Sequence, residues 1–172
     1  VVNERMETNI PGIYAVGDVV GRYMLAHVAM IEGRRAAESA MGVNSRMDYE
    51  AVPRCVYTSP EVASVGLIEI EAREKYGEIK IGRFPFFANG RALTLVNKPV
   101  GMVKIVAEAS YGQVLGVQVL GPDATELIAE AVLAIKMEVT LSDIIATMHA
   151  HPTFSETLME AALIAGGQGI HW

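Results

Sequence analysis

Short runs rich in β-branched residues fill the middle of the chain, and this pattern is typical of β-strands. Three runs come first: 54–59, 62–66 and 79–87. Pro85 marks the third run as an edge strand or as the site of a bulge. The clearest signal is 101–121, where two runs flank a turn from Ser110 to Gly112 and predict a hairpin. Together these runs predict a mostly antiparallel sheet.

Apolar residues at helical spacing take over after the hairpin. Residues 123–137 repeat such residues behind a capping box formed by Asp123 and Glu126, which predicts a long helix. Two further helices are predicted in the C-terminal part, and a brief one between the strands: 141–148, 154–167 and 71–77. This part therefore has strands first and helices last, which is the order of the α+β class.

The N-terminal part follows a different pattern. Residues 11–18 predict a turn and a short strand that ends in Gly-Asp. A loop follows, and then residues 25–41 predict a helix that stops at Gly42. Polar residues and a proline between 46 and 53 mark a boundary. We therefore expect a strand-loop-helix piece followed by an α+β domain, with these limits: 1–48 and 49–172.

Composition narrows the function classes. The chain has 172 residues, of which 51% are hydrophobic, and its formal net charge of -6 argues against nucleic acid as a partner. Cys55 is the only cysteine, which excludes an intrachain disulfide and favours a reducing, cytoplasmic setting. No apolar run reaches the ~20 residues of a membrane span. Val1 stands where a methionine is expected, so we expect the C-terminal part of a longer protein.

The stretch HAHPTFSE, from His149 to Glu156, is the strongest candidate for chemistry. In one interpretation Thr153 and Glu156 merely form the capping box of a helix. In the other, Pro152 fixes His151 in an extended or cis backbone while Glu156 orients its imidazole, as a general acid/base requires. The residues alone leave both open. His149 is the weaker candidate, and no metal site is predicted, because two imidazoles need further ligands.

Five segments resemble the flavin-dependent pyridine nucleotide–disulfide oxidoreductases. The HAHPT form of the histidine motif is most similar to the dihydrolipoamide dehydrogenase branch of that family. The other segments resemble the second FAD motif, the residues that follow it, and two regions of the interface domain: TNIPGIYAVGD (8–18), MLAH (24–27), VYTSPEVASVG (56–66) and GVQVLGPDATELI (116–128). They occur in the family's order along essentially the whole chain.

This resemblance implies a flavin site in the first part of the chain, as the remnant of an FAD-binding domain. Asp18 would accept hydrogen bonds from the ribityl hydroxyls of FAD, and Gly17 would let the backbone come close. The start of the next helix would lie against the pyrimidine end of the flavin, where backbone N–H groups stabilise charge. The residues implied there are Met24, Leu25, Ala26 and His27.

The resemblance also implies roles for the second part. His151 would be the acid/base that takes a proton from a dithiol, and Glu156 would orient it. The part from 49 to 172 would be the interface domain of a homodimer, in which the histidine serves the flavin and redox disulfide of the other subunit. The intact enzyme would oxidise dihydrolipoyl groups, carried by the lipoyl domain of a 2-oxoacid dehydrogenase or glycine cleavage complex, through the disulfide and FAD to NAD.

Departures from the family are as informative as the matches. The chain has no CxxxxC pair and no GxGxxG loop, so it does not complete the family's reaction alone. Phe154 replaces a common leucine, and Ile68 replaces a polar residue that would cap the helix after it. Two alternatives stay open: another disulfide reductase of the family, similar to glutathione or mercuric reductase, or a non-catalytic dimerisation module.

Overall fold

The computed structural model describes residues 1–95 and 98–171. The chain folds as two compact units, Val1–Tyr49 and Glu50–Trp172. The second unit is built on one antiparallel sheet of five strands in the order β1-β2-β5-β4-β3. The strands are β1 (Arg54–Val56), β2 (Glu61–Gly66), β3 (Ile79–Pro85), β4 (Met102–Glu108) and β5 (Val114–Gly121). The predicted hairpin is present as β4 and β5, and Pro85 ends β3 at the edge of the sheet, where the missing N–H costs no ladder hydrogen bond.

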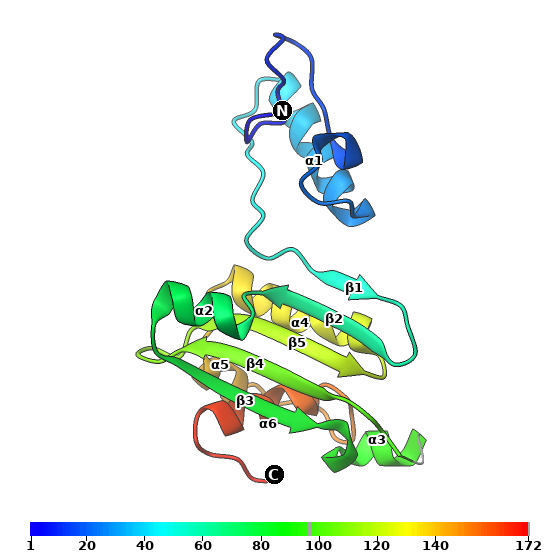
Figure 1. The fold of residues 1–172 in the computed structure, drawn as a ribbon, viewed down its shortest axis with the longest axis vertical. Coiled ribbons are helices and arrows are strands. Elements are labelled where there is room, and N and C mark those ends of the chain that lie inside the picture. The colour runs from blue at the N-terminus through cyan, green and yellow to red at the C-terminus, as the bar shows by residue number, and fades with distance from the viewer. Residues whose placement is uncertain (96–97, 172) are drawn as a thin grey trace. The chain divides into compact units, whose positions relative to one another are not determined.

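Helices cover the sheet mainly on one face. Figure 1 shows α4 and α6 lying behind the strands, with α2 on the opposite side. The helices of this unit are α2 (Glu69–Tyr76), α3 (Gly90–Leu95), α4 (Ala124–Lys136), α5 (Leu141–Ala146) and α6 (Glu156–Ala165), with a 3-10 turn η2 (Phe86–Ala88). Inward side chains of the strands and of α4 and α6 form a continuous apolar core that includes Val65, Phe84, Ile105, Val117 and Ile128. The predicted α+β class with a mostly antiparallel sheet is therefore confirmed.

Helix α6 and strand β3 touch through their backbones. A Cβ atom at Gly82 would lie 1.8 Å from the carbonyl oxygen of Ala161, a backbone atom that no side-chain rotation can move away. Only glycine fits at this crossing, because any larger residue would force the helix off the sheet. The position of α6 is therefore fixed by the strand beneath it.

The start of α4 differs from the prediction. Asp123 adopts a left-handed conformation with φ 54°, and its side chain caps nothing, so the predicted capping box with Glu126 is wrong. Glu61 of β2 takes over this role, because its carboxylate accepts hydrogen bonds from the backbone N–H of Thr125 at 3.0 Å and from its hydroxyl at 2.9 Å. A carboxylate 64 residues away in the sequence thus replaces the local cap.

The first unit contains the helix α1 (Ala26–Ala40) and the 3-10 turn η1 (Gly17–Val20). The strand predicted at 11–18 is reduced to an isolated antiparallel bridge between Glu7 and Tyr14, because only the residues around Glu7 lie alongside to pair with it. The interior of the first unit contains both apolar and polar residues. Its buried residues are Gly17 and six others with larger side chains: Met6, Val28, Met47, Glu32, Ser39 and Ser45.

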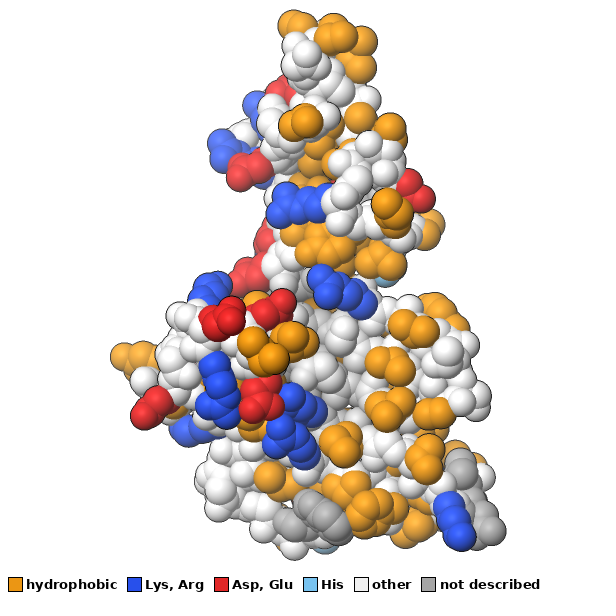
Figure 2. All heavy atoms as spheres, viewed as in Figure 1, with side chains coloured by type: hydrophobic (Ala, Val, Ile, Leu, Met, Phe, Trp, Pro, Cys, Tyr) orange, Lys and Arg blue, Asp and Glu red, His pale blue; other side chains and the backbone are white. Residues whose placement is uncertain are grey.

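A row of apolar side chains crosses the other face of the sheet. Val56, Val62, Leu120 and Met102 lie opposite one another on neighbouring strands, and each is at least 39% exposed. Figure 2 shows hydrophobic side chains gathered over this face of the second unit. Exposed apolar surface of this kind often marks a contact with another polypeptide. Among residues 1–95 and 98–171, no helix combines the length and the apolar character needed to cross a membrane.

Candidate active site

The histidine motif forms a loop between α5 and α6, and the structure brings its two predicted catalytic residues together. The Nδ1 atom of His151 lies 2.8 Å from Oε1 of Glu156. The histidine side chain is 77% exposed, whereas that of Glu156 is 17% exposed. The carboxylate at the start of α6 therefore holds one ring nitrogen, and the rest of the imidazole reaches outward.

Glu156 also serves the helix start. Its Oε2 atom accepts a hydrogen bond of 2.7 Å from the N–H of Thr153, which is the half of the predicted capping box that is present. The predicted cap by the Thr153 hydroxyl is absent: the N-cap residue of α6 is Ser155, and the Thr153 hydroxyl donates to the carbonyl of Ala150 at 2.6 Å. The helical and the catalytic interpretation of the motif are thus compatible: one carboxylate does both.

The environment of Glu156 favours its ionised form. Burial raises the pKa of its carboxyl group, but the Thr153 N–H and the His151 ring lower it by more, with a smaller contribution from His149. The pKa consequently lies below the ordinary value of 4.5, and the group is a carboxylate at neutral pH. The carboxylate beside Nδ1 keeps a proton on that nitrogen, so it sets the tautomer and the orientation of the His151 ring.

His149 occupies a different environment from His151. Its side chain is only 4% exposed, with Nδ1 2.9 Å from the carbonyl oxygen of Thr147 and Nε2 2.9 Å from Oε1 of Glu130 on α4. No local pattern selects Glu130, because it lies 19 residues before His149 on another helix, α4. A long-range ion pair of this kind is invisible to local patterns.

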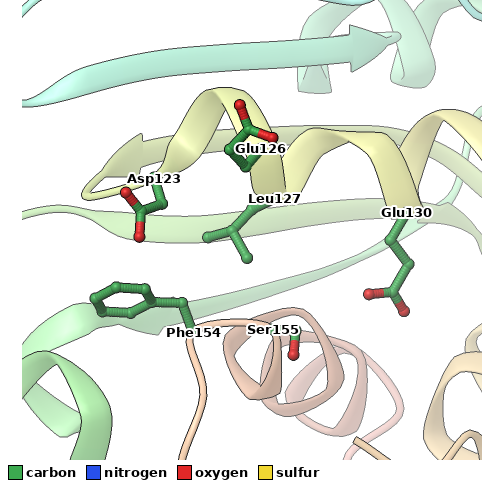
Figure 3. A pocket seen from close by; sticks show the side chains of 6 residues that line it. All are labelled: Asp123, Glu126, Leu127, Glu130, Phe154 and Ser155. Carbon is green, nitrogen blue, oxygen red and sulfur yellow. The ribbon is translucent and has the colours of Figure 1, made fainter.

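A cleft of about 300 Å³ lies beside the motif, between α4 and the beginning of α6. Figure 3 shows Leu127 and Phe154 facing each other across it, with Asp123 and Glu130 at opposite ends. Its remaining lining residues are Glu126 and Ser155. Phe154 also packs edge-on against Phe86, so the replacement of leucine by phenylalanine is accommodated in the core.

In the first unit, the predicted flavin residues Gly17 and Asp18 lie in η1, which packs against α1. Gly17 is buried with φ 74°, and a Cβ there would approach the Cβ of Ala29 to 3.2 Å. Asp18 is exposed at the surface of the same turn. A glycine is therefore required for the turn, and it presents the neighbouring carboxylate outward.

The start of α1 holds the other predicted flavin residues. Leu25 is its N-cap in an extended conformation, and no side chain caps the first turn. The N-cap residue of this helix of 15 residues therefore supplies no side-chain acceptor to the first turn. Three of the four predicted residues are exposed: Met24, Ala26 and His27.

Glu32 is a residue of this region that the sequence did not reveal. It is 1% exposed, and its carboxylate accepts hydrogen bonds of 2.6 Å from the Gly17 N–H and 2.6 Å from the Tyr49 hydroxyl. Glu32 thus holds η1 against α1 and satisfies the Gly17 N–H inside the unit. An exposed carboxylate, an uncapped helix start and a close backbone turn suit a ribityl chain and a flavin ring, so the residues present fit the FAD edge that the resemblance implies.

Cys55 adds no reactive thiolate to these sites. The Cys55 thiol is half-buried, and burial followed by the nearby Glu61 and Glu126 raises its pKa, so it stays protonated at neutral pH. Within the described ranges, no three His, Cys, Asp or Glu residues are grouped so that they could hold a metal ion. The acid/base pair of His151 and Glu156 is therefore the candidate site that the second unit offers.

Comparison with known proteins agrees with this geometry. Residues 52–162 match the dimerisation domain of the pyridine nucleotide-disulphide oxidoreductases, and residues 1–33 match a second model of that family. The chain is 54% identical over 170 residues to a dihydrolipoyl dehydrogenase of Thermus scotoductus, covering 99% of this chain and 36% of that protein. It is 47% identical to one of Bacillus subtilis, covering 99% and 37%, and 45% identical to the mitochondrial one of Pisum sativum, covering 99% and 34%. The chain thus spans about a third of the length of these relatives.

Solved structures give the same result. LpdA of Mycobacterium tuberculosis superposes with a TM-score of 0.86 at 33% identity, over 94% of this chain and 35% of that one. The HOCl-induced flavoprotein disulfide reductase RclA of Escherichia coli gives a TM-score of 0.87 at 26% identity, over 94% and 38%. The chain belongs to the pyridine nucleotide-disulphide oxidoreductase family, and most of it is the dimerisation domain of that family.

Proposed function

We propose that this chain is the C-terminal part of a dihydrolipoyl dehydrogenase, to which it contributes the acid/base and the dimer surface. The observation that carries the proposal is the hydrogen bond of His151 with Glu156, in which Nδ1 and Oε1 lie 2.8 Å apart, in a chain 54% identical to an enzyme of that name. Residues 1–48 would be the end of an FAD-binding domain and residues 49–172 the interface domain. The substrate would be a dihydrolipoyl group, and the electron acceptor NAD.

In the proposed reaction His151 moves the proton. Its Nδ1 is held by Glu156, so Nε2 is the nitrogen that faces outward and takes the proton from a substrate thiol. The thiolate that remains is the form that attacks a disulfide. Glu156 stabilises the imidazolium until the proton leaves again. The lowered pKa of the Glu156 carboxyl group supports this role, because the group is a carboxylate at neutral pH.

FAD, when bound, would accept the electron pair that NAD later receives. On this chain, Asp18 would bind its ribityl hydroxyls, and the turn at Gly17 would let the flavin approach the backbone. Met24, Leu25, Ala26 and His27 would place the uncapped N-terminus of α1 against the pyrimidine end of the ring. The exposure of Asp18 and of the first turn of α1 supports this assignment.

The proposed partners follow from the same role. A second copy would form a homodimer, and each histidine would serve the flavin and disulfide of the other copy. The exposed apolar row of the sheet, from Val56 to Met102, supports burial against further protein surface. The substrate would arrive on the lipoyl domain of a multienzyme complex. A reducing compartment such as the cytoplasm suits the single protonated Cys55.

A chimera tests the proposal. Residues 1–172 replace the matching segment of the Thermus scotoductus relative, which supplies the rest of the enzyme. We expect dihydrolipoamide oxidation with NAD, and a loss of roughly 10²-fold in kcat for His151→Gln with the flavin still bound, because proton transfer contributes on that order. His171→Gln is the matched control, since it removes a histidine of the same unit outside the motif.

Each outcome of the chimera experiment has a distinct meaning. A folded, flavin-loaded dimer without dithiol oxidation would favour the non-catalytic dimerisation module. Preferred turnover of glutathione disulfide or of mercuric ion would assign the chain to another branch of the family. Unchanged turnover in His151→Gln would refute the acid/base assignment.

A further inference from the structure

Among the described residues of the second unit, His149 is the histidine whose side chain is buried, and the proposed reaction gives it no role. Its ring lies between the Thr147 carbonyl at the end of α5 and the Glu130 carboxylate of α4. The two hydrogen bonds measure 2.9 Å each, and the side chain is 4% exposed. A ring enclosed in this way has no water to replace a missing partner, so both nitrogens must be satisfied by the two groups that face them.

Both of these groups are hydrogen-bond acceptors. A carbonyl oxygen only accepts, and an ionised carboxylate only accepts, whereas a neutral imidazole has a single N–H. A neutral His149 would therefore leave one nitrogen lone pair facing an oxygen lone pair at 2.9 Å. A doubly protonated ring donates to both oxygens and gains a charge-assisted bond to Glu130. The hydrogen-bond geometry thus requires the imidazolium, provided that Glu130 is ionised.

The charges around the ring favour the same state. The Glu130 carboxylate lies against Nε2 of the ring, and Glu156 is close enough for His149 to lower its pKa. His151 is the nearby cationic group when it is protonated. A carboxylate of α4 and one of α6 therefore lie near the ring, and both favour a positive charge there.

The pair also fixes the backbone that carries the proposed base. His149 ties the loop to α4 on the N-terminal side of His151. On the C-terminal side, the buried Asn89 donates from Nδ2 to the carbonyl of Thr153 at 3.0 Å. The exposed His151 ring thus sits between two buried anchors. Loss of either anchor would let the imidazole drift from Glu156 and from the substrate, and a misplacement of about 1 Å costs up to ~10²-fold in rate.

We propose that His149 is a positioning residue: as an imidazolium held between Thr147 and Glu130, it fastens the loop of His151 to α4. The effect of His149 on catalysis rests on the proposed function. The protonation of His149 and the rigidity of the loop are independent of that function. The two kinds of evidence are therefore measured separately.

The first measurement uses the 172-residue chain labelled with 15N in its histidines. His149, assigned by comparison with His149→Gln, is expected to show two N–H groups at neutral pH, with protons that exchange slowly. The Thr153 N–H, which is bound to Glu156, is expected to exchange about 10-fold faster in His149→Gln and in Glu130→Gln than in the original chain, and unchanged in His171→Gln. A His149 ring with one unprotonated nitrogen, or equal Thr153 exchange in all variants, would overturn the proposal whatever the chain's activity.

The second measurement uses the chimera. His149→Gln and Glu130→Gln should each lower kcat about 10-fold at unchanged KM, and the double variant should be no slower than either single one, because both remove the same pair. Additive losses would mean that the two residues act independently. If His151→Gln is slow while His149→Gln keeps full kcat, the positioning role fails and the proposed function survives. If His151→Gln keeps full kcat, the proposed function fails, and the exchange data alone decide on the loop.

Discussion

The interior of each of the two units is stabilised by a different kind of interaction. The second unit has a continuous apolar core in which strands and helices interdigitate, with residues such as Phe84 and Ile105 fully buried. The first unit buries three hydrophobic residues and organises them around polar ones, chiefly Glu32. The comparison teaches that packing specifies the larger unit and hydrogen bonding the smaller one. The two should therefore fail under different perturbations.

The contrast extends to the candidate sites. The proposed acid/base lies on a loop anchored to helices that pack on the sheet, and its carboxylate begins one of these helices. The proposed flavin edge lies on a turn whose N–H is held by a single buried carboxylate. The first site inherits the stability of a large core, whereas the second depends on one side chain.

The largest expected effect is Gly82→Ala in the second unit. The new methyl group would meet the backbone of α6, so we expect a loss of about 3 kcal/mol in the free energy of unfolding. Urea unfolding of the chain, followed by circular dichroism, measures it. Gly90→Ala is the control, because its methyl group would meet nothing closer than 4.0 Å. Equal stability of the two variants would show that close packing does not specify this unit.

A smaller effect is expected for Glu32→Ala in the first unit. The substitution leaves the buried Gly17 N–H without its acceptor, which costs about 2 kcal/mol of local stability. Hydrogen exchange at Gly17 reports this loss directly. Arg34→Ala, in the same helix, removes only an exposed ion pair with Glu38, and we expect no measurable change in exchange at Gly17. The polar character of this unit would be refuted if the two variants exchanged equally.

Alkaline pH should affect the first unit through Tyr49. Burial, followed by its hydrogen bond to Glu32, raises the pKa of its hydroxyl from 10.0 to about 12. The neutral form is favoured in the folded state, so its contribution is fully present below pH 10 and is lost as the pH rises through about 12. The stability advantage over Tyr49→Phe should disappear across this window, as measured by unfolding both proteins at each pH. A constant advantage would show that the hydroxyl proton plays no part.

The smallest expected effect is an increase in the stability of the first unit. Gly33 lies inside α1, and a methyl group there would meet nothing within 4 Å. Gly33→Ala should therefore stabilise the first unit by about 0.8 kcal/mol, because alanine loses less backbone entropy in a helix. Slower amide exchange along α1 would report the gain. Faster exchange would mean that an unseen contact forbids the methyl group.

The sequence predicted the second unit well because its signals are local. Alternating β-branched residues predicted the hairpin of β4 and β5, and apolar residues at helical spacing predicted α4 and α6. The pairing of His151 with Glu156 was also predictable, since only five positions separate them and Glu156 lies at the start of the helix that follows. The short helix α3 was missed, because its six residues carry no amphipathic pattern.

Interactions between segments that are distant in the sequence could not be predicted from local patterns. Glu61 caps α4 in place of Asp123, and nothing near Asp123 in the sequence signals a rival 62 positions earlier. Glu32 and Glu130 look like ordinary surface residues of helices, yet one is buried and the other binds His149. Burial of a carboxylate depends on which donors the fold brings to it, and local sequence does not contain that information.

The contact of α6 with Gly82 of β3 sets the position of Glu156 relative to the sheet. The helix rests on the strand backbone at Ala161, and Glu156 lies five residues earlier on the same rigid rod. The distance from the sheet to the carboxylate is consequently set by main-chain atoms, which do not change when side chains are replaced. Substitutions elsewhere in the core and on the surface should therefore leave the imidazole of His151 in place. The condition is that residue 82 remains a glycine.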